Sequence, residues 1–136
     1  MAYWLFKSEP SCWSWQEHVR AGVAEWDGVR NFQARGYLRA MVVGDRGFFY
    51  HSVTEKRIVG IVEVVKPYYP DPSDERGLFG MVDVRAVEAM KRAVTLADIK
   101  ADERLAHIPL LRQSRLSVMP IDDAAWRVIM ELGGHT

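Results

Sequence analysis

The residues best suited to chemistry lie between Trp26 and Ser52. This stretch joins an aromatic ring to an arginine, two side-chain amides and a polar pair that follows an apolar run: Trp26, Arg30, Asn31, Gln33 and His51–Ser52. Aromatic faces stack on flat rings, whereas guanidinium, amide and hydroxyl groups form hydrogen bonds with polar ring edges. The combination predicts a binding site for a flat ring with polar edges, such as a nucleobase.

The same sequence offers no complete catalytic set. His51 and Ser52 are the only adjacent base and nucleophile, and neighbours along a strand point to opposite faces. A Gly-x-Ser-x-Gly elbow and a Walker phosphate loop are both missing. The four histidines lack the spacing of metal ligands and there is one cysteine, so we expect neither a metal nor a cofactor. We interpret that cysteine, Cys12, as a small buried side chain.

Two of these residues have a purely structural interpretation as well. Trp26 is flanked by acids and a turn, so it is either a plate on which a base stacks or a lid on the core. Asn31 is either a helix N-cap or a reader of a base edge. Three other tryptophans lie in apolar segments and are expected in the core: Trp4, Trp13 and Trp15.

A second polar segment, from Leu110 to Val118, contains no acid and precedes an expected strand. Its polar members are two arginines, a glutamine and two serines: Arg112, Gln113, Ser114, Arg115 and Ser117. Such side chains clamp a phosphate or a base edge, or they satisfy the backbone of the loops around them. Both interpretations remain open at this point.

Composition limits the class of protein. The chain has 136 residues, is 49% hydrophobic and 26% charged, and is expected to form one domain over residues 1–136. A net charge of zero gives no global attraction to nucleic acid, although residues 26–57 carry six Lys/Arg against three acids. One cysteine and no apolar run long enough to cross a bilayer lead us to expect a cytoplasmic protein without a membrane contact.

The apolar patterns predict short elements. Strands are expected over residues 3–6, 46–50, 58–66, 81–87 and 116–119, with Gly60 at a bulge or a close approach and the prolines of 67–72 preventing regular pairing. Helices are expected over 15–21, 32–41, 96–101 and 123–132, after the capping residues Ser14, Asn31, Thr95 and Asp122. No alternation of strands and helices appears, so the pattern favours the α+β class, with a small, bent, mixed sheet of five or six strands.

Six motifs, in order along nearly the whole chain, resemble the EVE domain family of the PUA-like superfamily. They are YWLFKSEP at 3–10, EWDGVRNFQAR at 25–35, GDRGFFYHS at 44–52, IVGIVEV at 58–64, YPDP at 69–72 and LLRQSRLSV at 110–118. The resemblance implies a PUA-like β pseudo-barrel decorated by short helices. It also implies a cleft for a nucleobase, since related domains accommodate modified bases in DNA or RNA.

Carried over by motif position, the resemblance implies a cleft built from Lys7, Ser8, Glu9, Trp26, Val29, Arg30, Asn31, Gln33, Ala34, Tyr50, His51, Ser52, Arg112, Ser114, Arg115 and Ser117. Within this set we assign the stacking role to Trp26. Edge contacts fall to Ser8, Asn31 and Ser52, and phosphate or sugar contacts to Lys7, Arg30 and Arg115. One departure from the family pattern is the short segment Ser73–Phe79, which suggests a more open rim.

The function expected from these observations is a non-catalytic module that holds a modified or flipped base of DNA or RNA. One alternative is an enzyme acting on a modified nucleotide, with His51 as general base. Another is a module for a small ligand or a protein partner. The sequence leaves the base, the choice between DNA and RNA, and the oligomeric state open.

Overall fold

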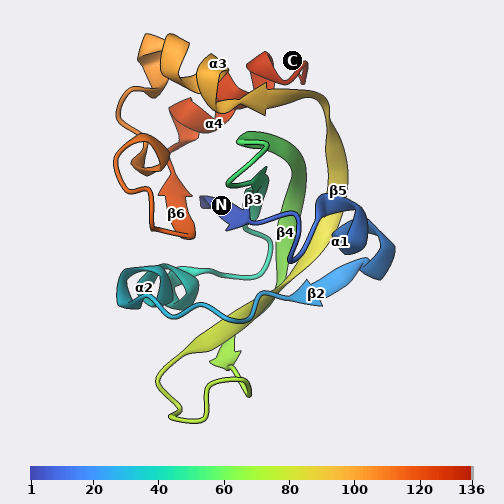
Figure 1. Cartoon of the computed structure of the whole chain (residues 1–136), viewed down its shortest axis with the longest axis vertical. Coiled ribbons are helices and arrows are strands. Elements are labelled where there is room, and N and C mark those ends of the chain that lie inside the picture. The colour runs from blue at the N-terminus through green and yellow to red at the C-terminus, as the bar shows by residue number, and fades with distance from the viewer. Residues whose placement is uncertain (136) are drawn as a thin grey trace.

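The computed structural model of the chain describes residues 1–135. Six strands form one sheet in the order β2-β5-β4-β3-β1-β6 (Figure 1). β1 and β3 are parallel, whereas the other neighbours are antiparallel. The strands are β1 Tyr3–Ser8, β2 Val23–Glu25, β3 Arg46–His51, β4 Arg57–Pro70, β5 Gly80–Thr95 and β6 Val118–Ile121. The predicted class, a mixed sheet with short helices, is confirmed.

Four helices decorate the sheet: α1 Trp15–Ala21, α2 Phe32–Ala40, α3 Leu96–Ala101 and α4 Asp123–Leu132. Each begins after the predicted capping residue, whose side chain accepts a backbone N–H of the first turn. In Figure 1, α3 and α4 lie together at one end of the molecule, whereas α2 lies nearer the other. None of the helices described in residues 1–135 has both the length and the apolar character needed to cross a membrane.

Two strands run through prolines that the sequence marks as breaks. β4 continues from Lys66 through Pro67 to Pro70. Its pairing with β3 ends at Glu63, and the last backbone hydrogen bonds on that edge join Val64 to Gly44 and Asp45. β6 passes through Pro120, opposite Trp4, as an edge strand that pairs with β1. Proline is tolerated at such edges because no neighbouring strand requires its missing N–H.

β5 is more than twice as long as the pattern of residues 81–87 predicts. Its pairing with β4 shifts register at several points, including between Ile58 and Gly60 and between Ile61 and Val62. Each bulge inserts a residue and interrupts the alternation of apolar and polar side chains. β2, with only three residues, and the 3-10 turns Glu103–Leu105 and Pro109–Leu111 are also too short to leave a periodic signal.

Gly60 allows the indole of Trp15 to lie directly on β4. A Cβ at position 60 would stand 2.5 Å from three carbons of that ring. Trp15 also donates its backbone N–H to Nε2 of His51 at 3.0 Å, at the end of β3. These two contacts seat α1 against the sheet, and the close approach predicted for Gly60 is confirmed.

We expect Gly60→Ala to lower the free energy of unfolding by about 1–3 kcal/mol, because the buried indole of Trp15 would have to move. Gly36→Ala in α2 is the matched control, since a Cβ there meets nothing within 4 Å. The control is expected to gain about 0.4–1 kcal/mol from a less flexible unfolded chain. Denaturant unfolding compares the two, and a Gly60→Ala protein as stable as wild type would contradict this packing.

Candidate functional site

A cleft of about 1030 Å³ opens where the end of β1 meets α1, β2 and the segment leading into α2. Of the predicted site residues, it is lined by Lys7, Ser8, Glu9, Trp26, Val29, Arg30, Asn31, Arg115 and Ser117. The backbone N–H of Lys7 donates to the carbonyl of Ser117 at 2.8 Å, which brings the two distant segments together. The structure thus assembles one hollow from three separate motifs.

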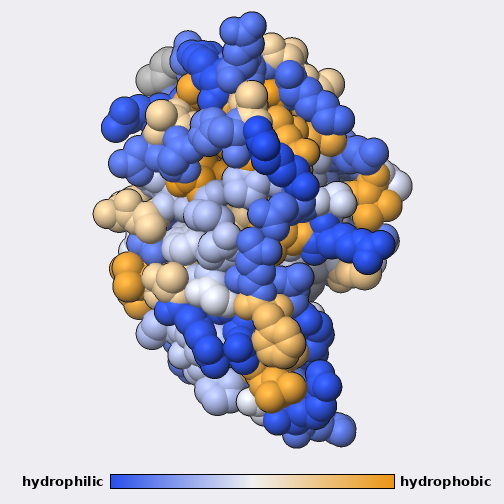
Figure 2. Space-filling view, turned by 90° about the vertical axis from the view of Figure 1, so that its left-hand side faces the viewer, coloured by the Kyte–Doolittle hydropathy of each residue, from blue (hydrophilic) through white to orange (hydrophobic). Residues whose placement is uncertain are grey.

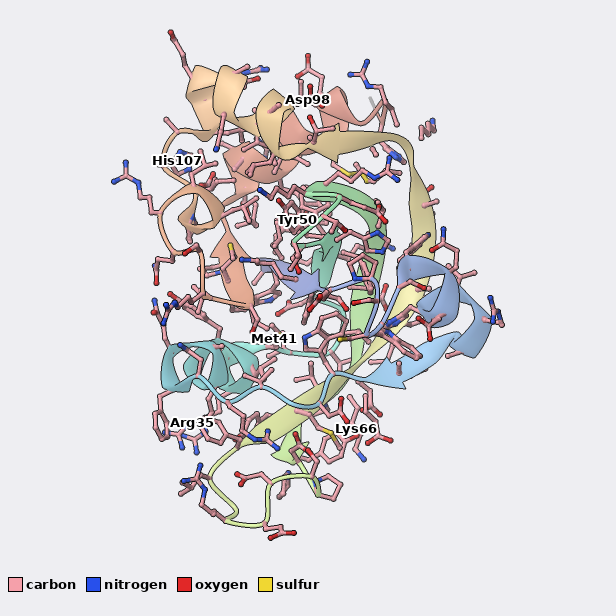
Figure 3. All side chains as sticks on the ribbon, viewed as in Figure 1. Arg35, Met41, Tyr50, Lys66, Asp98 and His107 are labelled. Atoms are coloured by element: carbon pink, nitrogen blue, oxygen red, sulfur yellow. The ribbon has the colours of Figure 1, made fainter. Side chains whose placement is uncertain are left out.

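The remaining predicted residues are not brought into this cleft. They are Gln33, Ala34, Tyr50, His51, Ser52, Arg112 and Ser114. Ala34 and Tyr50 are buried in the core, and Tyr50, on β3, is labelled in Figure 3. Ser52 instead supports the cleft, because its backbone N–H donates to the carbonyl of Ser8 at 2.9 Å. A motif that is carried over as a whole includes residues that are neighbours only along the chain. Their side chains alternate in direction, so only some of them face the cleft.

His51 is only 3% exposed, and both of its ring nitrogens are engaged. Nε2 accepts the backbone N–H of Trp15 at 3.0 Å, so Nδ1 carries the proton toward Oε1 of Glu55 at 2.9 Å. A general base needs a free nitrogen within reach of its substrate. The structure places His51 beneath α1, where both of its ring nitrogens hold protein partners.

Trp26 combines the two interpretations that the sequence left open. It is 8% exposed and meets Phe6 and Phe49 edge-on, with ring centroids 5.1 and 5.6 Å apart. Its backbone N–H donates to the carbonyl of Val82 at 2.7 Å. Trp26 is also one of the residues that line the cleft. Trp26 is therefore a core residue whose remaining surface forms part of the cleft wall.

A second indole in the cleft, that of Trp13, was expected in the core. It is half-buried and lines the cleft. Its Nε1–H donates to Nδ1 of His18 at 3.0 Å, and its carbonyl accepts the hydroxyl of Ser8 at 2.6 Å. Trp13 precedes the capping residue Ser14, where the chain has not yet entered the helix. That position was the available signal for a ring outside the core.

His18, which sequence reasoning missed, packs against both Trp13 and Trp26. It is fully buried, and its ring centroid lies 5.9 Å from that of Trp13 and 6.3 Å from that of Trp26. Because Nδ1 accepts from Trp13, Nε2 must carry the proton that is donated to the carbonyl of Val84 at 2.9 Å. Burial lowers the pKa of His18, and the hydrogen bond to Val84 opposes this only in part. The imidazole is therefore neutral.

Basic and acidic side chains from different elements line the cleft. On the β1 and β6 side, Lys7 donates to the carbonyl of Ser114 at 2.8 Å, and burial lowers its pKa. Arg115 is exposed and forms no ion pair or hydrogen bond within residues 1–135. On the β2 and β5 side the cleft is lined by the acids Glu25, Asp27 and Asp83, while Glu9 lies at the end of β1. This arrangement suits a ligand with a negative end and a hydrogen-bond donor end.

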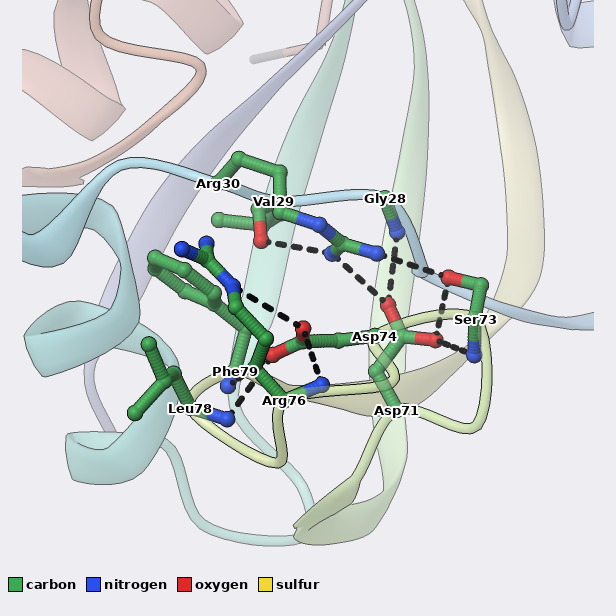
Figure 4. Close-up of polar contacts among 9 residues, drawn as sticks. All are labelled: Gly28, Val29, Arg30, Asp71, Ser73, Asp74, Arg76, Leu78 and Phe79. Atoms are coloured by element: carbon green, nitrogen blue, oxygen red, sulfur yellow. Dashed lines mark hydrogen bonds and ion pairs between the residues drawn. The ribbon is translucent and has the colours of Figure 1, made fainter.

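Arg30, a predicted phosphate contact, is already engaged (Figure 4). Its guanidinium contacts Oδ2 of Asp71 at 3.2 Å and the hydroxyl of Ser73 at 2.9 Å. The same carboxylate accepts the backbone N–H of Gly28 at 2.9 Å. Asn31 caps α2 by accepting the N–H of Ala34 at 2.9 Å. These contacts fix the course of the backbone along the cleft rim.

Cys12 is exposed and lines the cleft, so its expected burial is wrong. It lies in the turn between β1 and α1, where its backbone N–H donates to the carbonyl of Glu9 at 2.9 Å. Within residues 1–135, no group of three or more His, Cys, Asp or Glu side chains is placed to hold a metal ion.

The neutral state of His18 can be tested by NMR titration. We expect a pKa below 6.5 for His18, so the unfolded chain binds the extra proton first and the free energy of unfolding falls as the pH drops below about 6.5. Trp13→Phe removes the N–H that faces Nδ1 and should move the pKa back toward 6.5. A pKa at or above 6.5 in the wild type would contradict the assigned hydrogen bonds.

The Asp71 network has its own pH signature. Burial alone would raise the pKa of Asp71, but hydrogen bonds from Ser73, Gly28 and Arg30 outweigh it and lower the pKa from 3.8 to about 2. The charge therefore contributes about 2 kcal/mol above pH 4, which is lost as the pH falls toward 2. We expect Asp71→Asn to lose this amount at neutral pH and to converge with wild type near pH 2. Glu75→Gln, in the same loop, is the control without an expected effect.

Comparisons with known proteins agree with this geometry. The family model of the EVE domain matches residues 2–132. Human thymocyte nuclear protein 1 is 33% identical over 165 aligned residues, which cover 96% of this chain and 73% of the relative. The alignment is longer than the 136 residues of this chain, so the relative contains insertions.

Solved structures superpose closely. Protein Atu2648 from Agrobacterium tumefaciens has a TM-score of 0.96 at 44% identity, covering 98% of this chain and 94% of the other. Human THYN1 protein, in complex with DNA containing 5-methylcytosine, has a TM-score of 0.90 at 33% identity, covering 98% of each chain. A YTH domain from Zygosaccharomyces rouxii, at 17% identity and a TM-score of 0.60, covers 99% of this chain and 88% of the other and shares the fold. The fold is PUA-like, and the chain belongs to the EVE domain family.

Proposed function

We propose that this protein is a non-catalytic reader that holds one modified or flipped nucleobase of DNA or RNA in the cleft. The observation that carries the proposal is the cleft wall, where the indoles of Trp13 and Trp26 lie among groups that form hydrogen bonds. The complex of the related human protein with 5-methylcytosine-containing DNA supports it. The buried, doubly engaged His51 supports a reader rather than an enzyme.

Energetics favour a base that is already unpaired. Stacking on an aromatic ring contributes about 1–3 kcal/mol per base, and flipping a base out of a duplex costs a few kcal/mol. The burial of one methyl group adds only about 0.8 kcal/mol. Stacking and methyl burial together therefore barely offset the opening of a duplex. Contacts with the phosphate and with the base edge must supply the rest.

The basic and acidic residues of the cleft predict how a nucleotide is oriented. Lys7 and Arg115 attract the phosphate, whereas the carboxylates of Glu25, Asp27 and Asp83 accept hydrogen bonds from an amino group. Carboxylates pair with the exocyclic amino group of cytosine in the same manner. We therefore expect bases that carry an amino group to bind more tightly than thymine or uracil.

The exposed thiol of Cys12 fits a reducing compartment, and we propose that the protein is located in the cytoplasm.

The quenching of tryptophan fluorescence tests the proposal, because two tryptophans line the cleft. The probes are short single strands with one central base: cytosine, 5-methylcytosine, adenine, N6-methyladenine or thymine. We expect quenching that depends on the base, with an affinity that falls as salt rises. Quenching by none of the probes would overturn the proposal and favour a small ligand or a protein partner.

The matched variants are two arginines of one loop. Arg115→Ala removes a cation at the cleft, and we expect it to lower the slope of log K against log salt by about 0.7, the value for one phosphate of a single strand. Arg112→Ala removes an exposed arginine that lies outside the cleft and should leave the slope unchanged. Equal effects of both variants would show that binding does not involve the cleft.

A further inference from the structure

Phe32 is an aromatic side chain with no role in the core. It is the first residue of α2, follows Asn31 on the cleft rim, and is 59% exposed. An exposed aromatic ring contributes little to the stability of the fold, because little of its apolar surface is buried. In proteins that bind single strands, such rings stack with the bases. We propose that Phe32, Arg35 and Arg76 form a platform that binds the nucleotide next to the base held in the cleft. This inference rests on the proposed function.

One face of the Phe32 ring is backed by rigid contacts. The guanidinium of Arg35 lies over it, 4.7 Å from the ring centroid, and Nη1 of Arg35 donates to the carbonyl of Leu78 at 2.9 Å. Phe79 is buried, and its centroid lies 4.9 Å from that of Phe32. The ring is thus held in place while the residue as a whole stays 59% exposed. A preformed surface of this kind loses little side-chain entropy when a base stacks on it.

The loop that backs the platform exposes its one arginine and buries the side chains of two of its acids. Asp71 is buried against Arg30 and Gly28 (Figure 4). The carboxylate of Asp74 accepts the backbone N–H groups of residues 76, 78 and 79, and its side chain is 4% exposed. The side chain of Arg76 is 71% exposed, and Glu75 is the exposed acid of this loop. Arg76 is the exposed cation of this loop, and its Nε lies 4.0 Å from Oδ1 of Asp74.

The position of the platform identifies its occupant. It begins one residue beyond the cleft rim, and Arg30 lines the cleft while lying 5.7 Å from the Phe79 centroid. Figure 2 shows apolar side chains set among hydrophilic ones at the lower end of this face, and Figure 3 shows Arg35 at the same end, under α2. An aromatic surface with arginines around it, continuous with a base cleft, fits the flanking nucleotide of a single strand. An apolar protein partner would not require the cations.

The experiment compares two ligands that differ only in flanking nucleotides. One is 5-methyl-deoxycytidine monophosphate, and the other is a short single strand with that nucleotide at its centre. We expect Phe32→Ser to weaken binding of the strand about fivefold to tenfold and to leave binding of the mononucleotide unchanged. Val43→Ser is the control, because Val43 is equally exposed, at 59%, in the connection between α2 and β3.

Arg76→Ala separates charge from stacking. It should lower the salt slope for the strand by about 0.7 without changing the slope for the mononucleotide, whereas Arg127→Ala on α4 should change neither. If the strand binds and Phe32→Ser matches wild type, the platform is overturned while the reader function stands. If neither ligand binds to the wild type, the reader function fails and the platform fails with it. Equal weakening of both ligands by Phe32→Ser would indicate a damaged cleft and would also overturn the platform.

Discussion

The cleft depends on one neutral imidazole. His18 accepts a hydrogen bond from Trp13 on one nitrogen and donates one to Val84 on the other, so a single tautomer satisfies both partners. This arrangement joins the turn before α1, the helix itself and the central sheet. The indoles that line the cleft are consequently positioned before any ligand arrives. Such preorganisation reduces the entropic cost of binding, which matters for a site whose contacts with one base are few.

The electrostatics of the molecule follow from where its acids are used. The chain has 18 basic and 18 acidic residues, yet several acids are structural ligands for backbone N–H groups. Asp45 accepts from Ala2 and Val42 and from the indole of Trp4, and Asp71 accepts from Gly28 and Ser73. Elsewhere, Arg112 and Arg115 are exposed and form no ion pair within residues 1–135. A zero net charge is therefore compatible with a locally positive surface.

Local signals in the sequence were reliable, and signals that depend on distant contacts were not. The helix starts were predicted because capping involves residues three positions apart, as in the Ser14–Glu17 pair. The lengths of β4 and β5 were not predicted, because bulges and edges that tolerate proline depend on which strands pair. The rim from Val29 to Asn31 was predicted from contiguous motif residues. The contribution of His18 was not, because it requires a partner on β5 that is 66 residues away.

The position of Cys12 has a practical consequence. It is the one cysteine of the sequence, its thiol is exposed, and it lies on the wall of the cleft. A thiol-directed probe would therefore modify a single site without prior mutagenesis. A fluorophore attached there would report directly on occupancy of the cleft. A disulfide-forming tether would retain weak ligands long enough for crystallography, and would turn a transient complex into one that can be isolated.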